Sequence, residues 1–500
     1  MTKSRWIFWH RRDLRFSNNV GLSQAAKRSK SLVGIYVLDP NIINPEKSYI
    51  PISPARIWFL AHSLKELHKS WEEAGSQLII IEGEPEKIIP CLAKIICAEG
   101  VIWNKNAEPY EINRDKEVES SLRKESVKIF SYWDQLLVNP ENIKTLHGNP
   151  YKVYGHFHKN WEKKLDLEIN SQKDLITTIK PRSLTKLNKV ELLSLKKSLF
   201  GNKIDKPLDT LNDLLYINKF NSDYNCPCKP GESAAKKQLK NFISGSAITQ
   251  YEFGRDMPFE DATSKLSAAL NFGTISCRDT FGAANSSKSN STETHQIKSI
   301  NIWIKELAWR EFYQNVLFHF PQLANGPYQN KWKHFPWQNN SKWFQSWIDG
   351  TTGFPIIDAS MRQLKQSGWM HNRCRMIVAS FLVKDLLCDW KLGEKAFMKY
   401  LVDGDLASNN GGWQWTASTG MDPKPLRIFN PHRQANKFDK EAKYIRYWLP
   451  ELSHIDNASL ITGDILPIER KGYPPPFVSH NTQQKIFRGL YSELTRTSKS

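Results

Sequence analysis

The first 135 residues alternate between short apolar runs and longer segments with helical periodicity. Leu78–Ile81 is the clearest apolar run, and Ser53–Pro54 is a helix start signal ahead of a long periodic segment. Strands that alternate with helices predict a parallel, doubly wound sheet, here of five strands. The expected strands are Arg5–His10, Ser31–Asp39, Gln77–Gly83, Val101–Asn104 and Lys128–Trp133, and the expected helices are Asn19–Arg28, Ser53–Ala74, Pro85–Ala98 and Ile112–Lys124.

The pattern changes after this α/β domain (1–135). Residues 136–210 are polar and weakly periodic, which predicts a long connector over the surface with at most short helices. From 211 to 480 strand-like alternation is lost, and helical patterns between Gly, Pro and Asn predict an all-α domain. Ser286–Thr294 reads as a polar loop inside it, and the basic tail 481–500 as one final helix.

The net charge of the chain suggests a polyanionic partner. The 500 residues carry a formal net charge of +19 with a pI near 9.4. Such a surplus favours a polyanion, usually nucleic acid, over the alternative of a Lys-rich solvated surface. Part of the excess lies in featureless stretches such as Lys180–Lys206 and marks no site. The 18 Trp residues suggest aromatic packing, stacking or electron chemistry.

Cysteine usage and the chain start indicate a reducing compartment. Seven Cys at irregular spacing form no disulfide framework, and Cys226-Pro-Cys228 lacks the second ligand pair of a zinc site, so we expect no metal. The start, Met1–Trp6, enters a strand pattern without a signal peptide, and no apolar run approaches the roughly 20 residues of a membrane span. A cytoplasmic protein without a membrane partner is expected.

Polar residues follow the expected strands. His10–Asp13, Asp39 and Asn104–Glu108 stand at carboxyl ends, where doubly wound sheets bind ligands. No G-x-G-x-x-G follows the first strand, which argues against an ordinary dinucleotide site there.

Three stretches of the helical half carry candidate chemistry, each with a plain structural alternative. Asp403–Trp415 combines carboxylates, amides, glycines and tryptophans, although Asn-Asn-Gly-Gly is also good turn chemistry. Asp261–Ser267 precedes a helix and suits a phosphate, but taken locally an ordinary N-cap at Thr263 or Ser264 is the better explanation. Gly368–Met376 reads as a basic amphipathic helix in which Arg375 could reach Asp403 bidentately.

Trp303–Tyr313 places an aromatic stripe on one helical face. Such a stripe is more often core than a cofactor site. Glu306 in its middle is harder to explain as core, because a buried carboxylate needs a partner.

Taken in order, these motifs resemble the photolyase/cryptochrome family. The series Thr-Ser-x-Leu-Ser, Trp-x-x-Glu-Leu-x-Trp-Arg-Glu-Phe-Tyr, Gly-Trp-Met-His-Asn-Arg-x-Arg-Met and Asp-Gly-Asp-x-Ala-x-Asn-Asn-Gly-Gly-Trp-Gln-Trp is similar to that of class I cyclobutane pyrimidine dimer photolyases of microbial type. The similarity extends from His10 to Tyr473. It implies an N-terminal antenna domain, a linker and a C-terminal helical domain that binds FAD, in a monomer that acts on UV-damaged DNA.

The resemblance also implies the cofactor residues. Asn409 matches the residue that faces flavin N5, and Asn at that position favours the repair branch of the family. The expected FAD contacts are Tyr251, Thr263, Ser264, Lys265, Leu266, Ser267, Trp303, Glu306, Arg310, Arg375, Asp403, Gly404, Asp405 and Asn409.

In the implied reaction, blue light excites reduced FAD, which gives one electron to a dimer that has been flipped out of the duplex, as photolyases require. Glu306 matches the carboxyl that stabilises charge on the dimer. The expected lesion contacts are Arg255, Glu306, Trp309, Asn372, Arg373, Met376 and Trp415. His stands at the positions of Asn372 and Met376 in related enzymes for the (6-4) photoproduct, so the cyclobutane dimer is favoured. Trp337, Trp390 and Trp413 match the electron-hopping chain, although each alone reads as core.

The antenna site departs from the family pattern. An 8-hydroxy-5-deazaflavin antenna is expected from Arg12, Tyr36, Asp39, Arg56 and Glu108. Asn106 and Asn271 stand where the deazaflavin pattern has Asp and Lys, so a reduced folate or no antenna are the alternatives.

Two other functions stay open. One is a cryptochrome-like photoreceptor without repair activity, which Asn409 and the lack of a long tail after Tyr473 disfavour. The other is a flavin-binding module for single-stranded DNA, which Glu306 with Trp415 disfavours by analogy.

Overall fold

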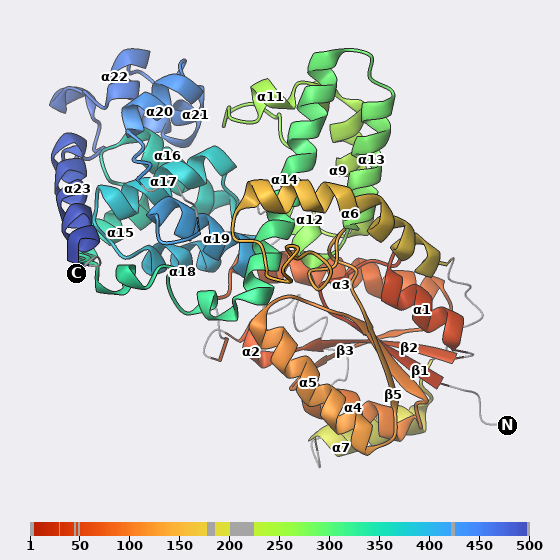
Figure 1. Cartoon of the computed structure of the whole chain (residues 1–500). Helices are drawn as coiled ribbons and strands as arrows, with labels where there is room; N and C mark the ends of the chain where they lie inside the picture. The colour runs from red at the N-terminus through yellow and green to blue at the C-terminus, as the bar shows by residue number, and fades with distance from the viewer. Residues whose placement is uncertain are drawn as a thin grey trace.

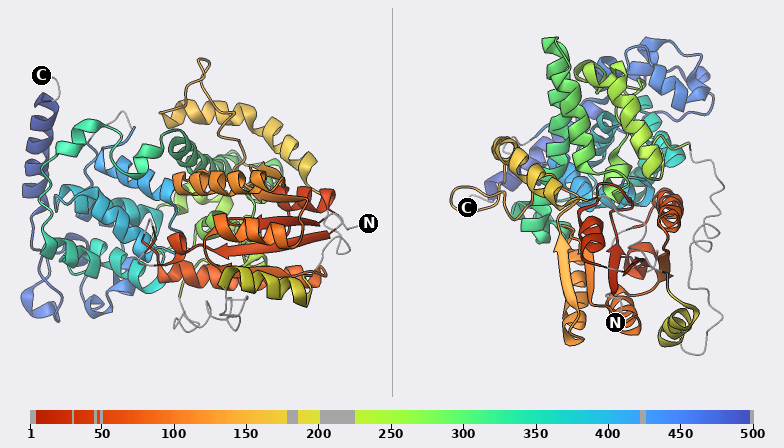
Figure 2. Two further views of the ribbon diagram at one scale, coloured as in Figure 1. Left: turned by 90° about the horizontal axis from the view of Figure 1, so that it is seen from below. Right: turned by 90° about the vertical axis from the view of Figure 1, so that its right-hand side faces the viewer.

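The structure is a computed structural model, and it describes residues 5–29, 31–44, 47–48, 51–177, 186–200, 225–421 and 426–497. It contains a sheet domain and a larger helical domain packed side by side (Figures 1 and 2). The expected boundary at residues 210 and 211 lies outside the described residues.

The N-terminal domain is a five-stranded parallel sheet with strand order β3-β2-β1-β4-β5. Along β1, Trp6 and Phe8 face helices α1 and α3, whereas Ile7 and Trp9 face α4, α5 and α7, so both faces are buried. Each predicted strand is confirmed to within two residues at either end, and each predicted helix to within three. The elements are β1 (Arg5–His10), α1 (Val20–Arg28), β2 (Ser31–Leu38), α2 (Pro40–Ile43), α3 (Pro54–Glu73), β3 (Leu78–Glu82), α4 (Pro85–Ile95), β4 (Gly100–Asn104), α5 (Pro109–Lys124) and β5 (Lys128–Tyr132).

The connector is more regular than the sequence suggested. It contains the 22-residue helix α6 (Tyr154–Leu175), followed by α7 (Lys189–Phe200), which packs on α4. The prediction of short helices over the surface was wrong, because Phe157, Trp161, Leu165 and Ile169 form a buried stripe on α6. This stripe packs against α14 of the helical domain.

The helical domain is built around α14, α17 and α19 (Figure 1). α13 continues through Ser289, so the expected loop Ser286–Thr294 is shorter than predicted. The final helix α23 is observed where one was expected. The elements are α9 (Glu232–Ser244), α10 (Ser246–Thr249), α11 (Tyr251–Gly254), α12 (Ser267–Phe272), α13 (Cys277–Ser289), α14 (Thr294–His319), α15 (Ser341–Asp349), α16 (Pro355–Ser367), α17 (Asn372–Lys384), α18 (Trp390–Tyr400), α19 (Leu406–Ala417), α20 (Pro431–Phe438), α21 (Lys443–Trp448), α22 (Asn457–Thr462) and α23 (His480–Thr497), with 3₁₀ turns η2 (Pro321–Ala324), η3 (Asn330–His334), η4 (Pro450–Leu452) and η5 (Pro467–Glu469).

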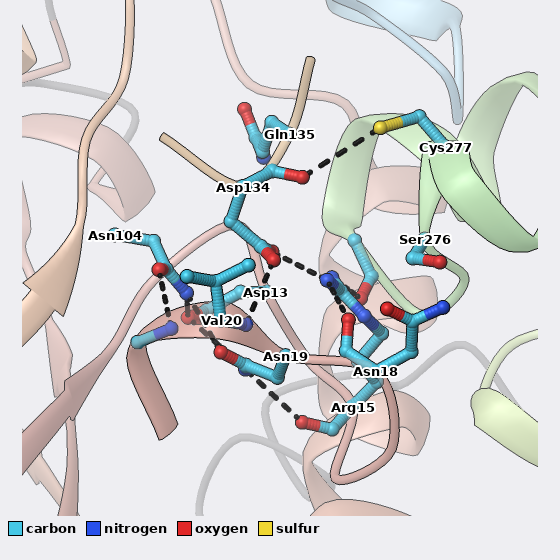
Figure 3. A network of polar contacts seen from close by, with 12 residues as sticks. Asp13, Arg15, Asn18, Asn19, Val20, Asn104, Asp134, Gln135, Ser276 and Cys277 are labelled. Atoms are coloured by element: carbon cyan, nitrogen blue, oxygen red, sulfur yellow. Dashed lines mark hydrogen bonds and ion pairs between the residues drawn. The ribbon is translucent and has the colours of Figure 1, made fainter. Parts of the chain in front are cut away.

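A buried polar network joins the two domains (Figure 3). Asp134, just after β5, accepts hydrogen bonds from the backbone N–H of Val20 at 3.0 Å and from Arg278 of α13 at 2.6 Å, and it also pairs with Arg15. Burial opposes the charge of Asp134, but Arg15 and Arg278 outweigh burial and hold its pKa below the ordinary value. The network therefore fixes the loop after β1 against the helical domain.

Candidate functional site

A cavity with a volume of about 710 Å³ lies in the helical domain. Ligand pockets for cofactor-sized molecules have volumes of roughly 300–1,000 Å³. The lining comes from α14, α17 and α19, and also from residues 152–155 of the connector. The expected site residues among its lining are Arg255, Ser267, Glu306, Trp309, Arg310, Asn372, Arg375, Met376, Asp403, Gly404, Asp405, Asn409, Trp413 and Trp415.

Helix α14 supplies the acidic group of this cavity. Glu306 accepts a hydrogen bond from Arg255 at 2.7 Å, and the two side chains are 32% and 25% exposed. Burial raises the pKa of Glu306, although Arg255 opposes the shift. The carboxyl is therefore oriented at the cavity wall and partly accessible from it.

An ion pair lies at the start of α19. Arg375 of α17 donates to both carboxylate oxygens of Asp403, at 3.1 and 2.8 Å, as predicted. Asp405 caps α19 by accepting from the N–H of Ser408 at 2.7 Å, and it also accepts from Gln314 at 2.7 Å. These contacts fix the 403–405 loop, which we define as Asp403, Gly404 and Asp405.

Gly411 allows α19 to lie close to α14. A Cβ atom at Gly411 would lie 2.1 Å from the ring of Tyr313, so no larger residue fits there. Gly412 also lines the cavity, and no atom lies within 4 Å of its Cβ position. The Asn-Asn-Gly-Gly stretch is thus part of a helix, not the tight turn that its composition suggested.

A hydrogen bond to α18 fixes the side chain of Asn409. Its amide nitrogen donates to the backbone oxygen of Glu394 at 3.0 Å, which leaves its amide oxygen to accept. Asn410 donates to the Glu394 carboxylate at 2.8 Å, and burial raises the pKa of that carboxyl to about 7. The two asparagines therefore fix this part of α19 against α18.

The cavity fits FAD by size and by donor chemistry. Its guanidinium and amide groups suit phosphates and flavin ring edges. The hydroxyl of Thr263 is buried and makes no hydrogen bond within the described part of the chain. An unsatisfied buried hydroxyl beside the expected phosphate position is consistent with a bound ligand.

Some predicted residues lie outside the lining. Trp303 is 3% exposed and packs on Phe242 at a ring distance of 5.4 Å. Lys265 pairs with Asp261 at 2.5 Å, and Arg373 pairs with Asp256 at 2.8 Å. Tyr251, Thr263, Ser264 and Leu266 precede or flank the lining residue Ser267 without lining the cavity themselves.

The three tryptophans of the expected electron chain belong to one hydrophobic core. Trp413 lines the cavity and meets Phe397 at a ring distance of 5.0 Å. Trp390 is 2% exposed, and Trp337 lies at the edge of the core, stacked on Trp332 at 6.2 Å. The set thus extends from the cavity wall toward the surface.

The sequence did not reveal the contribution of the connector. Tyr154 stacks on Trp309 with ring centroids 3.5 Å apart and an interplanar angle of 5°, and Lys152 also lines the cavity. Tyr154 lies one turn before the buried stripe of α6. Its helical spacing from Phe157 and Trp161 was the sequence signal that could have identified it as a packed residue. Tyr328 and Arg427 are further lining residues that were missed, and the guanidinium of Arg427 lies 4.7 Å from the ring of Trp415.

A second, much smaller cavity lies at the carboxyl edge of the sheet. This sheet-edge cavity has a volume of about 60 Å³ and is lined in part by Arg12, Tyr36, Arg56, Glu111, Arg114 and Asn271. Three of the five expected antenna residues line it. The other two contact lining arginines: Glu108 lies 2.6 Å from Arg12, and Asp39 lies 3.5 Å from Arg114. In this conformation the cavity is smaller than a three-ring chromophore.

Within the described residues, no helix is long and apolar enough to cross a membrane.

Comparisons with known proteins agree with this geometry. Residues 6–175 match a family model described as DNA photolyase, and residues 303–493 match the FAD binding domain of DNA photolyase. A deoxyribodipyrimidine photo-lyase from Synechococcus is 47% identical over 98% of this chain and 96% of its own length.

Solved structures give the same result. A class III photolyase from Agrobacterium tumefaciens superimposes with a TM-score of 0.84 at 33% identity, covering 99% of this chain and 98% of its own. A cryptochrome from Synechocystis has a TM-score of 0.82 at 26% identity, covering 98% of this chain and 99% of its own. The chain therefore belongs to the photolyase/cryptochrome family.

Proposed function

We propose that this protein is a deoxyribodipyrimidine photolyase that repairs cyclobutane pyrimidine dimers in DNA with light and reduced FAD. The observation that carries the proposal is the meeting of Glu306, Trp309, Trp415 and Asn409 at one cavity of about 710 Å³. These residues come from two helices, and the cavity gives them one common ligand space. When bound, photoexcited reduced FAD supplies the electron that opens the cyclobutane ring.

The chain itself orients the cofactor and the lesion. Arg375, Asp403 and Asn409 would hold FAD through polar contacts, since all three line the cavity. Trp309 and Trp415 offer aromatic faces to flipped-out bases, and Glu306 offers a preorganised hydrogen-bond partner for charge that develops on the dimer.

Positive charge around the cavity supports DNA as the partner. Lys152, Arg255 and Arg427 are lining residues from three separate segments of the chain, and the net charge is +19. Basic side chains around a cavity suit the phosphates that flank a flipped dinucleotide.

We also propose that Trp413, Trp390 and Trp337 carry electrons from the surface to oxidised flavin. The Trp413→Phe variant is expected to slow photoreduction and to leave repair by chemically pre-reduced protein intact. Photoreduction at the wild-type rate, followed by absorbance of the flavin, would remove Trp413 from this role.

Repair itself is the decisive test. Purified, reduced protein is mixed with a duplex that carries one thymine dimer, and the return of thymine absorbance is followed under blue light and in the dark. Light-dependent return is expected. A normal flavin spectrum with tight DNA binding but no return would instead support a cryptochrome-like photoreceptor without repair activity.

A further inference from the structure

Arg12 is the central group of the sheet-edge cavity. Its guanidinium lies 2.6 Å from Glu108, 3.2 Å from Glu111 and 3.9 Å from Asp405. Glu108 and Glu111 belong to the sheet domain, whereas Asp405 belongs to the 403–405 loop of the large cavity. One partly buried cation, with its side chain 15% exposed, therefore lies between the edge of the sheet and the candidate flavin pocket.

Asn271 makes the same connection through hydrogen bonds. Its amide oxygen accepts from Arg12 at 3.2 Å, and its amide nitrogen donates to the backbone oxygen of Gly404 at 3.0 Å. Asn271 is 6% exposed, and its bond to Gly404 is shielded from water. A shielded bond to a backbone carbonyl is costly to lose, because that carbonyl is then left without a partner.

The backbone around this pair leaves little freedom. Gly273 has a φ of +65°, and a Cβ atom there would lie 2.1 Å from the backbone oxygen of Arg12. Leu14 donates from its N–H to the Phe272 oxygen at 3.1 Å, and Arg15 donates to the Gly273 oxygen at 3.1 Å. Arg15 is in turn held by Asp134, in the network of Figure 3. Arg12 and Asn271 are thus fixed relative to each other by the domain interface.

We propose that Arg12 and Asn271 form an interdomain clamp that positions the 403–405 loop for flavin binding. The proposal rests on the proposed function, since it takes the large cavity as the FAD site. The guanidinium of Arg12 pairs with Glu108 and Glu111, and Asn271 links Arg12 to Gly404 through its two hydrogen bonds. Arg12 and Asn271 are positioning residues, because they act on the cofactor through the loop.

The test compares variants that separate the two bonds of Asn271. Asn271→Asp keeps an acceptor for Arg12 and removes the donor to Gly404, whereas Asn271→Ala removes both. Asn106→Ala is the matched control, because Asn106 is also a buried asparagine at this edge, also 6% exposed, and no hydrogen bond to the 403–405 loop is described for it. The measurement is the rate of FAD release after dilution, followed by the fluorescence of free FAD.

Both Asn271 variants are expected to release FAD about tenfold faster than wild type, the size of effect that loss of one shielded hydrogen bond gives, whereas Asn106→Ala stays within about twofold. The flavin circular dichroism band should also change in the Asn271 variants only. Thermal unfolding of the apoproteins supplies the structural control, since a purely structural role would lower apoprotein stability without changing release.

If Asn271→Asp releases FAD at the wild-type rate, the clamp is overturned. It is also overturned if Asn106→Ala accelerates FAD release as much as the Asn271 variants do. The readout is flavin release and not repair. A failed repair assay alongside faster release from the Asn271 variants would therefore overturn the proposed function and still support the clamp.

Discussion

The two cavities are built from the same kinds of side chain but differ more than tenfold in volume, about 710 Å³ against about 60 Å³. In the large cavity, Arg375 pairs with one carboxylate, and amides and aromatic rings face the open space. At the sheet edge, Arg12 alone meets Glu108, Glu111 and Asp405, and the paired side chains fill the site. Charges that neutralise one another across a cavity close it, whereas charges paired along its wall keep it open.

The largest effect is expected from Arg375→Ala, because it would leave Asp403, whose side chain is 2% exposed, without its partner. Loss of one partner of a buried pair costs about 3 kcal/mol or more, so FAD affinity should fall at least about 100-fold. Titration of apoprotein with FAD measures this. Arg362→Ala is the control, since Arg362 pairs with Glu451 at 2.7 Å and is similarly exposed. Equal losses in both variants would contradict a special role for the 403–405 loop.

Glu394 gives a pH test of the contact between α18 and the lining residues Asn409 and Asn410. Its folded pKa of about 7 lies above its ordinary value of 4.5, so its contribution to stability is complete below pH 4.5 and is lost as pH rises to about 7. Relative to Glu394→Gln, wild-type stability should fall by about 2 kcal/mol between roughly pH 5.5 and 8. Urea unfolding of both proteins at the two pH values measures this. Parallel stability curves would show that Glu394 is ionised throughout.

Glu306→Gln is expected to lower repair per absorbed photon about tenfold while FAD stays bound, because it removes the ionisable group that faces the lesion. Thymine recovery per photon and the flavin spectrum are the two readouts. Glu252→Gln serves as control, since Glu252 pairs with Lys298 at 2.5 Å and does not line the cavity. Unchanged repair by Glu306→Gln would remove Glu306 from the mechanism.

The smallest effect is expected when a second chromophore is added, because we expect it not to bind at the sheet-edge cavity. Added 8-hydroxy-5-deazaflavin should not bind to FAD-loaded wild-type protein, because a cavity of about 60 Å³ has no space for three fused rings. Equilibrium dialysis followed by absorption spectroscopy measures this. Stoichiometric binding would show that Arg12 moves aside, and the contrast between the two cavities would then fail.

The sequence predicted the local geometry of the site well where one helix supplies it. Glu306, Trp309 and Arg310 were expected on one face of α14, and all three line the cavity. The same periodicity put Trp303 on that face, yet this residue packs on Phe242 instead. Helical spacing fixes direction around the axis, but the partner at each turn depends on which element packs there.

Contacts between distant segments could not be predicted in this way. Tyr154 and Trp309 are 155 positions apart in the chain, and nothing local to either residue indicates a stack at 3.5 Å. The connector was assigned to the surface because its polar residues masked the stripe of Phe157 and Trp161. Only the packing of α6 on α14 makes this segment part of the site.

The sequence by itself determined the order of strands and helices, the four motifs and the chemistry of the groups that they carry. Side-chain period and charge are properties of neighbours in the chain, so the residues alone specify them. The tertiary structure decided which of those groups share a cavity and how much space remains between them. Volume and charge pairing depend on distances across the fold, and for Arg12, Asn271 and Gly404 those distances exist only once the two domains are packed together.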